Sequence, residues 1–93
     1  MSVIRINKFE AAQGKADELF AFLQSLQPYI SSSKGCVSCE VLRHHDDTGS
    51  FVIIEKWKSI EFHKQSLENY PKEEMQAVMS LLGAPPEGSF YHP

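Results

Sequence analysis

Residues 51–63 read FVIIEKWKSIEFH, and this stretch decides the fold. Its first half is rich in β-branched and aromatic residues that alternate between two faces, which predicts a strand from Ser50 to Lys58. Ser59 is a good N-cap, because its hydroxyl can accept a hydrogen bond from a free N–H of a first helical turn. We therefore expect a short helix from Ile60 to about Glu68, directly after the strand.

The predicted strand has two largely apolar faces. One face carries Phe51, Ile53, Glu55 and Trp57, and the other carries Val52, Ile54 and Lys56. Apolar faces of this kind should both be covered in the folded protein. We expect helices on one face, and we expect the sheet of a second copy of the chain on the face with Phe51, Ile53 and Trp57.

A second strand is expected just before this one. Residues 36–45 have an extended pattern, and the turn-forming residues 46–49 (DDTG) predict that the two strands form a hairpin. Cys36 and Cys39 make a C-x-x-C pattern. Residues three apart on a regular strand point to opposite faces, with Cα atoms roughly 10 Å apart and beyond disulfide reach. We therefore interpret both as ordinary strand thiols, with a redox or metal role as the alternative.

The N-terminal third predicts a strand followed by a helix. Residues 3–9 are rich in β-branched side chains and precede a break that contains glycine. Residues 15–32 repeat apolar side chains at spacings of three and four, which is typical of an amphipathic helix. Pro28 lies inside this helix and removes one backbone donor, so we expect a bend or an irregular last turn.

The C-terminal third predicts one more helix and a terminal strand. Pro71 suits the first turn of a helix that ends at Gly83, with Met75, Val78, Met79 and Leu82 expected to face the core. The tail reads as an edge strand or as an arm packed on a partner. The complete order is that of a ferredoxin-like split β-α-β arrangement, an α+β fold with an antiparallel sheet, and residues 1–93 are expected to form a single domain.

Composition excludes several classes of partner. The chain has 93 residues, a formal net charge of −3, 42% hydrophobic residues and 23% charged residues, which is ordinary for a globular protein. This charge provides no basic surface for nucleic acid or for an anionic membrane. The N-terminus lacks the apolar centre of a secretion signal, so we expect a cytoplasmic protein. Nucleotide-binding, zinc-protease and serine-hydrolase motifs do not occur in the sequence.

The segments KGCVSCEVLRH and FVIIEKWKSIEFH, placed after an amphipathic helix, resemble the antibiotic biosynthesis monooxygenase family. The central feature is an E-x-W pattern, Glu55 to Trp57, at a strand end before a Ser-capped helix. This resemblance implies a dimeric α+β barrel, with a homodimer formed through sheet faces. It also implies a pocket between the sheet and the helices that holds a small aromatic molecule, and chemistry that needs no cofactor.

The resemblance also implies site residues. Asn7 and Trp57 match family pocket positions and are expected to position the substrate, and His63 is a possible base. Many family members carry a histidine where Ser66 and Leu67 stand here. We further expect contacts with substrate from Arg5, Phe51, Ile53, Glu55, Phe62 and Ser66. No metal site is expected, since residues 44–47 (HHDD) lie at the solvated end of a hairpin and cannot converge on one ion.

The leading hypothesis is a cofactor-independent monooxygenase acting on a small electron-rich aromatic such as a quinol or a phenol. The alternative from another class is a non-catalytic dimer that binds a small hydrophobic ligand. A heme-degrading or isomerase-like relative is a third possibility that the family implies, and the missing histidine counts against heme ligation.

Overall fold

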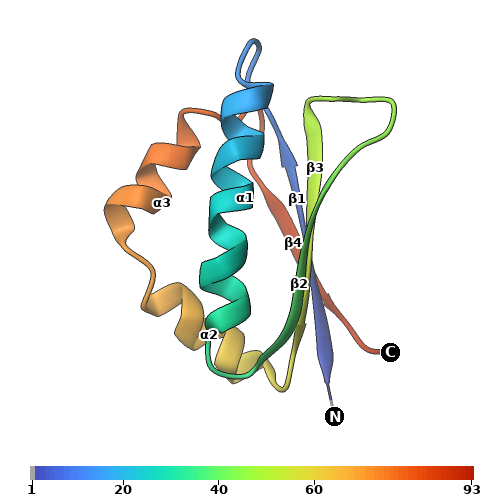
Figure 1. Cartoon of the computed structure of the whole chain (residues 1–93), viewed down its shortest axis with the longest axis vertical. Helices are drawn as coiled ribbons and strands as arrows, with labels where there is room; N and C mark the ends of the chain where they lie inside the picture. Colours follow the sequence, from blue (N-terminus) through green and yellow to red (C-terminus); the bar gives the residue numbers. More distant parts are fainter. Residues whose placement is uncertain (1) are drawn as a thin grey trace.

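A computed structural model describes residues 2–93 of the chain. It contains four strands and three helices, which are shown in Figure 1. Their bounds are β1 Val3–Glu10, α1 Ala16–Ser32, β2 Cys36–Arg43, β3 Ser50–Trp57, α2 Ile60–Glu68, α3 Lys72–Met79 and β4 Glu87–Tyr91. The predicted α+β fold of the ferredoxin-like type is therefore confirmed.

The four strands form one antiparallel sheet in the order β2-β3-β1-β4. The two central strands are β1 and β3, and Arg5 lies directly opposite Glu55 between them. On its other side, β1 pairs with β4, where Asn7 lies opposite Gly88. All three helices of residues 2–93 lie on the same face of the sheet, and none of them covers the other face (Figure 1). The register therefore brings polar side chains of β1 and β3 together beneath the helices, next to Gly88 of β4.

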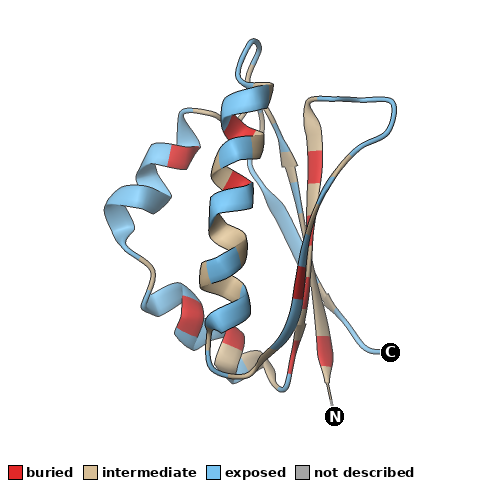
Figure 2. Cartoon of the chain, in the orientation of Figure 1, coloured by how far each residue is buried: buried red, intermediate tan, exposed pale blue. Residues whose placement is uncertain are grey.

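The face of β3 that packs against the helices is the reverse of the one we expected. Phe51 and Trp57 have no exposed surface and Ile53 has 1%, and they lie on the helix side, with Phe51 and Ile53 in one cluster with Leu19 and Leu23 of α1. Figure 2 shows buried segments on α1 and on the strands that it faces. The expectation of a second copy over this face was wrong, because the helices cover the larger side chains. The open face carries Val52, Ile54 and Lys56, none of which is aromatic.

A β-bulge changes the prediction for the two cysteines. The register of β2 against β3 shifts between Cys36 and Ser38. An extra residue of this kind disturbs the strict alternation of side chains. As a result Cys39 is buried in the core and Cys36 packs against the same core, although we expected them on opposite faces. Both are free thiols.

The helix predictions are largely confirmed, with two corrections in the third helix, the first of which is that it ends at Met79 rather than at Gly83 and so does not include Leu82. Ser59 caps α2, and its hydroxyl accepts the N–H of Phe62 at 3.4 Å. In α3 only Val78 is buried, while Met75 and Met79 are 40% and 55% exposed rather than core residues. Helix α1 continues past Pro28 to Ser32. Among residues 2–93, no helix has both the length and the apolar content needed to cross a bilayer.

Candidate functional site

A cavity of about 230 Å³ lies between the sheet and the three helices. Its walls are mostly apolar, and polar side chains of β1, β3 and α2 line it together with Tyr29 of α1 and Glu87 of β4. The lining residues on which the site depends are Arg5, Asn7, Ile53, Glu55, His63 and Ser66. A small apolar cavity with a few convergent polar groups is the usual form of a binding site for a small molecule.

These six residues are among the nine that the sequence suggested for the site. The other three do not line the cavity. Phe51 is a core residue stacked on Phe20, with ring centroids 5.4 Å apart. Trp57 is fully buried behind the cavity wall. Phe62 points toward Gly35 and lines a separate hollow.

A chain of hydrogen bonds crosses the sheet beneath the cavity. Arg5 Nε donates to Asn7 Oδ1 at 3.0 Å, and Asn7 Nδ2 donates to Glu55 Oε2 at 2.9 Å. From the other side, Trp57 Nε1 donates to Glu55 Oε1 at 2.8 Å. Each carboxylate oxygen of Glu55 therefore has one donor from the protein. Since a carboxylate oxygen has more than one lone pair, each can still accept a hydrogen bond from a ligand.

His63 approaches Glu55 from α2. Its Nε2 lies 4.0 Å from Glu55 Oε1, which is too long for a direct hydrogen bond. Its Nδ1 is fully enclosed and has no hydrogen-bond partner among the described residues. The ring is held edge-on by Trp57 and by Phe90, with centroids 5.6 Å and 5.2 Å away. Because His63 lines the cavity while Nδ1 is enclosed, Nε2 is the nitrogen through which it can reach a ligand.

The two titratable groups of the cavity have shifted pKa values. Burial raises the pKa of Glu55, and the hydrogen bond from Trp57, the charge of Arg5 and the hydrogen bond from Asn7 oppose that shift. Burial, together with the charge of Arg5, lowers the pKa of His63 to about 4. His63 is therefore neutral near pH 7, and its 4.0 Å contact with Glu55 is not an ion pair at that pH. A carboxyl with a raised pKa in an apolar cavity is a typical general base or acid.

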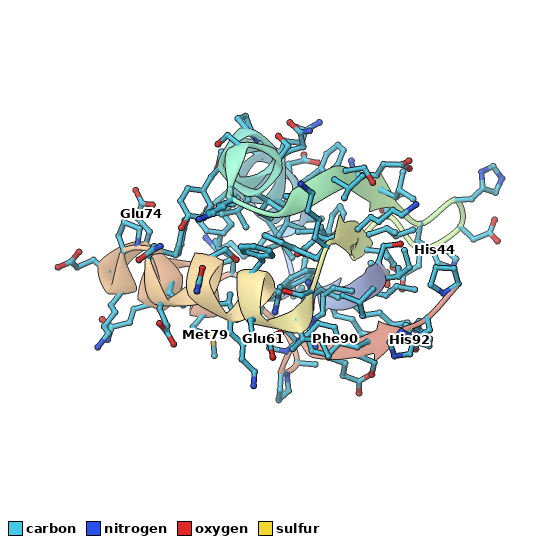
Figure 3. The ribbon with its side chains drawn as sticks, turned by 90° about the horizontal axis from the view of Figure 1, so that it is seen from below. His44, Glu61, Glu74, Met79, Phe90 and His92 are labelled. Carbon is cyan, nitrogen blue, oxygen red and sulfur yellow. The ribbon has the colours of Figure 1, made fainter. Side chains whose placement is uncertain are left out.

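Two residues of β4 belong to the site, and the sequence analysis did not select either. Gly88 lines the cavity opposite Asn7. Phe90 extends from β4 toward α2, where it contacts His63, and its ring also lies 4.6 Å from the Arg5 guanidinium (Figure 3). The short tail has no hydrophobic periodicity from which these contacts could be found, and a glycine next to a strand-forming segment is the only signal.

A second, more polar hollow lies behind the cavity. It is lined by residues of α1, α2 and the turn after α1, including Lys34, Phe62 and Gln65. Tyr29 and Ser66 line both spaces, and the Tyr29 hydroxyl donates to the Ser66 carbonyl at 2.7 Å. This hydrogen bond lies between the hollow and the cavity.

The histidines at the hairpin end are part of a turn. His44 Nδ1 accepts the backbone N–H groups of Asp46 and Asp47 at 3.1 Å and 2.9 Å, and His45 is exposed. Within residues 2–93 no group of three or more histidine, cysteine, aspartate or glutamate side chains could hold a metal ion.

Comparisons with known proteins give one family match for the chain and several matches of fold. A family model for antibiotic biosynthesis monooxygenases matches residues 2–79. A search of curated protein sequences found no significant match. Among solved structures, a Chloroflexus aurantiacus protein named for the same family is 30% identical, with a TM-score of 0.82, and the match covers 100% of this chain and 93% of that one.

Two more distant structures share the fold. One is a variant of SnoaB, a cofactor-independent oxygenase from Streptomyces nogalater, which is 20% identical with a TM-score of 0.82. That match covers 99% of this chain and 92% of the oxygenase. The other is PA3566 from Pseudomonas aeruginosa, which is 18% identical with a TM-score of 0.90, covering 99% and 93% of the two chains. At these identities the likeness is one of fold.

Proposed function

Because the chain belongs to the antibiotic biosynthesis monooxygenase family, we propose that it is a cofactor-independent monooxygenase acting on a small electron-rich aromatic, a quinol or a phenol. The observation that carries this proposal is the position of Glu55. Its carboxylate lies in an apolar cavity, is fixed by Asn7 and Trp57, and faces His63 across 4.0 Å. The fold that the chain shares with SnoaB, a cofactor-independent oxygenase, supports it.

The gap between Glu55 and His63 suits one hydroxyl oxygen. An oxygen about 2.8 Å from both atoms would bridge 4.0 Å with an angle of about 90° at the oxygen. In this arrangement Glu55 Oε1 takes the proton of the substrate hydroxyl, and His63 Nε2 donates a hydrogen bond to the oxygen that remains. The base is thus Glu55, whose pKa is raised, rather than His63, whose pKa is lowered.

The oxidation needs no external reductant, because the substrate supplies every electron. Deprotonation by Glu55 gives a quinol anion that transfers one electron to dioxygen, and the resulting radical pair combines into a ring hydroperoxide. Loss of water from the hydroperoxide leaves a hydroxyquinone. A quinol and one dioxygen thus become a hydroxyquinone and one water, with four electrons given by the ring and four taken by dioxygen. Apolar walls exclude water from the anion while it reacts.

Oxygen uptake by the purified, metal-chelated protein with a panel of hydroquinones and phenols tests this function. Uptake above that of heat-treated protein is expected. Glu55→Gln should lower kcat by about 100- to 10,000-fold, as expected for loss of a general base. Glu61→Gln, the same change at an exposed carboxylate of α2 labelled in Figure 3, is the control and should leave the rate unchanged. Ligand binding without turnover would favour the non-catalytic alternative.

We also propose a homodimer formed through the open face of the sheet. That face carries half-buried apolar residues of the central strands together with more exposed ones at the edges, namely Ile4, Ile6, Leu42, Val52, Ile54 and Tyr91. An apolar surface of this kind on a small domain favours association. Light scattering at micromolar concentration is expected to give twice the chain mass, and a monomer mass would refute the dimer.

A further inference from the structure

The cavity contains one guanidinium, that of Arg5, which forms no ion pair with a carboxylate of residues 2–93. Arg5 is the only lysine or arginine among the lining residues that the structure describes. Its Nε is used in the hydrogen bond to Asn7, and its planar group lies over the ring of Phe90 at 4.6 Å. Asn7 and Phe90 thus fix the orientation of the guanidinium at the cavity wall.

No carboxylate forms an ion pair with Arg5 within residues 2–93. Glu55 is separated from it by Asn7, which accepts from Arg5 and donates to Glu55. Glu87, the other acidic lining residue, is exposed and is not in salt-bridge contact with Arg5. The two terminal nitrogens of Arg5 likewise have no hydrogen-bond acceptor in the described part of the chain. A fixed guanidinium with both terminal nitrogens free is suited to a two-point contact with a carboxylate.

Gly88 provides the space that this arrangement needs. A Cβ placed on Gly88 would collide with Arg5 Nη2 and with Asn7 Oδ1. The backbone of Gly88 is not in the left-handed region, so the glycine is required here by space rather than by conformation. Strand β4 therefore holds Arg5 through Phe90 and leaves room for it at Gly88.

We propose that Arg5 is a carboxylate-binding subsite and that the substrate is a hydroxylated aromatic acid rather than a neutral quinol. This inference rests on the proposed function, which places the hydroxyl of the substrate at Glu55. The hydroxyl to be deprotonated lies between Glu55 and His63, and the carboxylate lies on the terminal nitrogens of Arg5. The charge of Arg5 is then balanced by the ligand before the reaction starts.

Calorimetric binding without oxygen tests the subsite separately from turnover. The probes are 2,5-dihydroxybenzoate and its methyl ester, which share a quinol ring and differ in the charged group. The acid should bind about 10- to 100-fold more tightly than the ester, as expected for a charge-assisted pair of hydrogen bonds. Arg5→Gln should abolish this preference. Lys8→Gln removes an exposed positive charge from the same strand outside the cavity, and it should keep the preference.

Several results would overturn the subsite. They are equal affinities of acid and ester for the wild type, failure of the acid to bind at millimolar concentration, and a preference that survives in Arg5→Gln. Equal affinities combined with a lower kcat in Arg5→Gln would mean that Arg5 stabilises only an anion formed during the reaction. Gly88→Ala is a second variant, checked for folding by circular dichroism, and it should also weaken the preference because it displaces Arg5.

The subsite and the oxygenase function can fail independently. A preference for the acid without oxygen uptake would leave Arg5 as a binding group and contradict only the oxygenase. Oxygen uptake with neutral quinols, combined with equal binding of acid and ester, would contradict only the subsite.

Discussion

Trp57 donates its indole N–H to Glu55 Oε1 at 2.8 Å, so the two ends of the E-x-W pattern form one hydrogen-bonded unit. Residues two apart on a strand point to the same face, which places both side chains beneath the helices. Trp57 has no exposed surface and does not line the cavity. We therefore propose that it acts on a ligand through Glu55, as a positioning residue, rather than by contact.

Replacing Trp57 with phenylalanine should destabilise the fold and shift the acid limb of the pH–rate profile. The change leaves Glu55 Oε1 without its protein donor, which should cost about 1–3 kcal/mol of unfolding free energy. Because this donor lowers the pKa of Glu55, its loss should raise that pKa further and move the acid limb of kcat/KM to higher pH. Urea unfolding and a pH–rate profile measure the two effects.

A double-mutant cycle separates this interaction from the loss of the indole ring. If Trp57 acts through Glu55, the costs of Trp57→Phe and Glu55→Gln should not add, and a coupling of about 0.5–3 kcal/mol is expected. Additive costs, or an unchanged acid limb, would show that Trp57 is only a core aromatic.

The sequence predicted the elements of the fold because their signals are local. The spacing of apolar residues in 15–32 and the cap at Ser59 depend only on neighbouring residues, and α1 and α2 form where these signals predict them. The alternation in β3 defines two faces, but it does not say which one packs against the helices. Since both faces are apolar, that choice depends on the side-chain volumes that the helices must cover, and the prediction was wrong.

The site was predictable as a set of residues but not as an arrangement. Asn7 and Glu55 were selected, yet the hydrogen bond between them depends on the register of β1 against β3, which places Arg5 opposite Glu55. The same long-range pairing brings Gly88 to Asn7. The bulge at Cys36 is likewise a product of strand pairing. Such contacts between distant segments leave no local pattern in the sequence.

Protonation of His63 should destabilise the fold between about pH 6.5 and pH 4. Burial lowers its pKa from 6.5 to about 4, so the unfolded chain takes up a proton at a higher pH than the folded protein does. The stabilisation is present above pH 6.5 and is lost as the pH falls through that window, by up to about 2–3 kcal/mol. The contribution of Glu55 to the pH dependence of stability has the opposite sign, because a raised carboxyl pKa favours the folded state at low pH.

Comparing variants removes the contribution of Glu55 and of Arg5, the other charged groups near the ring. The stability advantage of the wild type over His63→Gln, measured by urea unfolding, should shrink as the pH falls from 7 to 4. His45→Gln is the control, because the His45 side chain is 97% exposed. A constant advantage across this range would contradict the burial of a neutral His63.

The two thiols should be unreactive in the folded protein. Burial, with a smaller contribution from Glu55, raises the pKa of Cys39 to about 12 and also raises the pKa of Cys36. Because the thiolate is the reactive form, Cys39 in a Cys36→Ser variant should react with a disulfide reagent at pH 8 about 100- to 1000-fold more slowly than in urea. Similar rates in both states, or a disulfide formed by the native protein in air, would support the redox interpretation.

Substitutions at Gly35 and Gly14 should differ in cost although their backbones are alike. Both have positive φ, +85° and +77°, where an alanine costs about 1–2 kcal/mol in conformational strain. A Cβ on Gly14 meets nothing within 4 Å, whereas a Cβ on Gly35 collides with the ring of Phe62. Gly35→Ala should therefore cost about 1–3 kcal/mol more than Gly14→Ala in urea unfolding.

The difference between the glycines also concerns the site. Phe62 precedes His63 on α2, so a displaced Phe62 ring should move the helix that carries the imidazole. Gly35→Ala should lower ligand affinity while Gly14→Ala leaves it unchanged. Adding Phe62→Ala to Gly35→Ala removes the collision, and the double variant should lose less stability than the sum of the two single changes. Equal costs for the two glycine variants would mean that α2 adjusts without strain, and the close packing of Gly35 on Phe62 would then have no part in positioning His63.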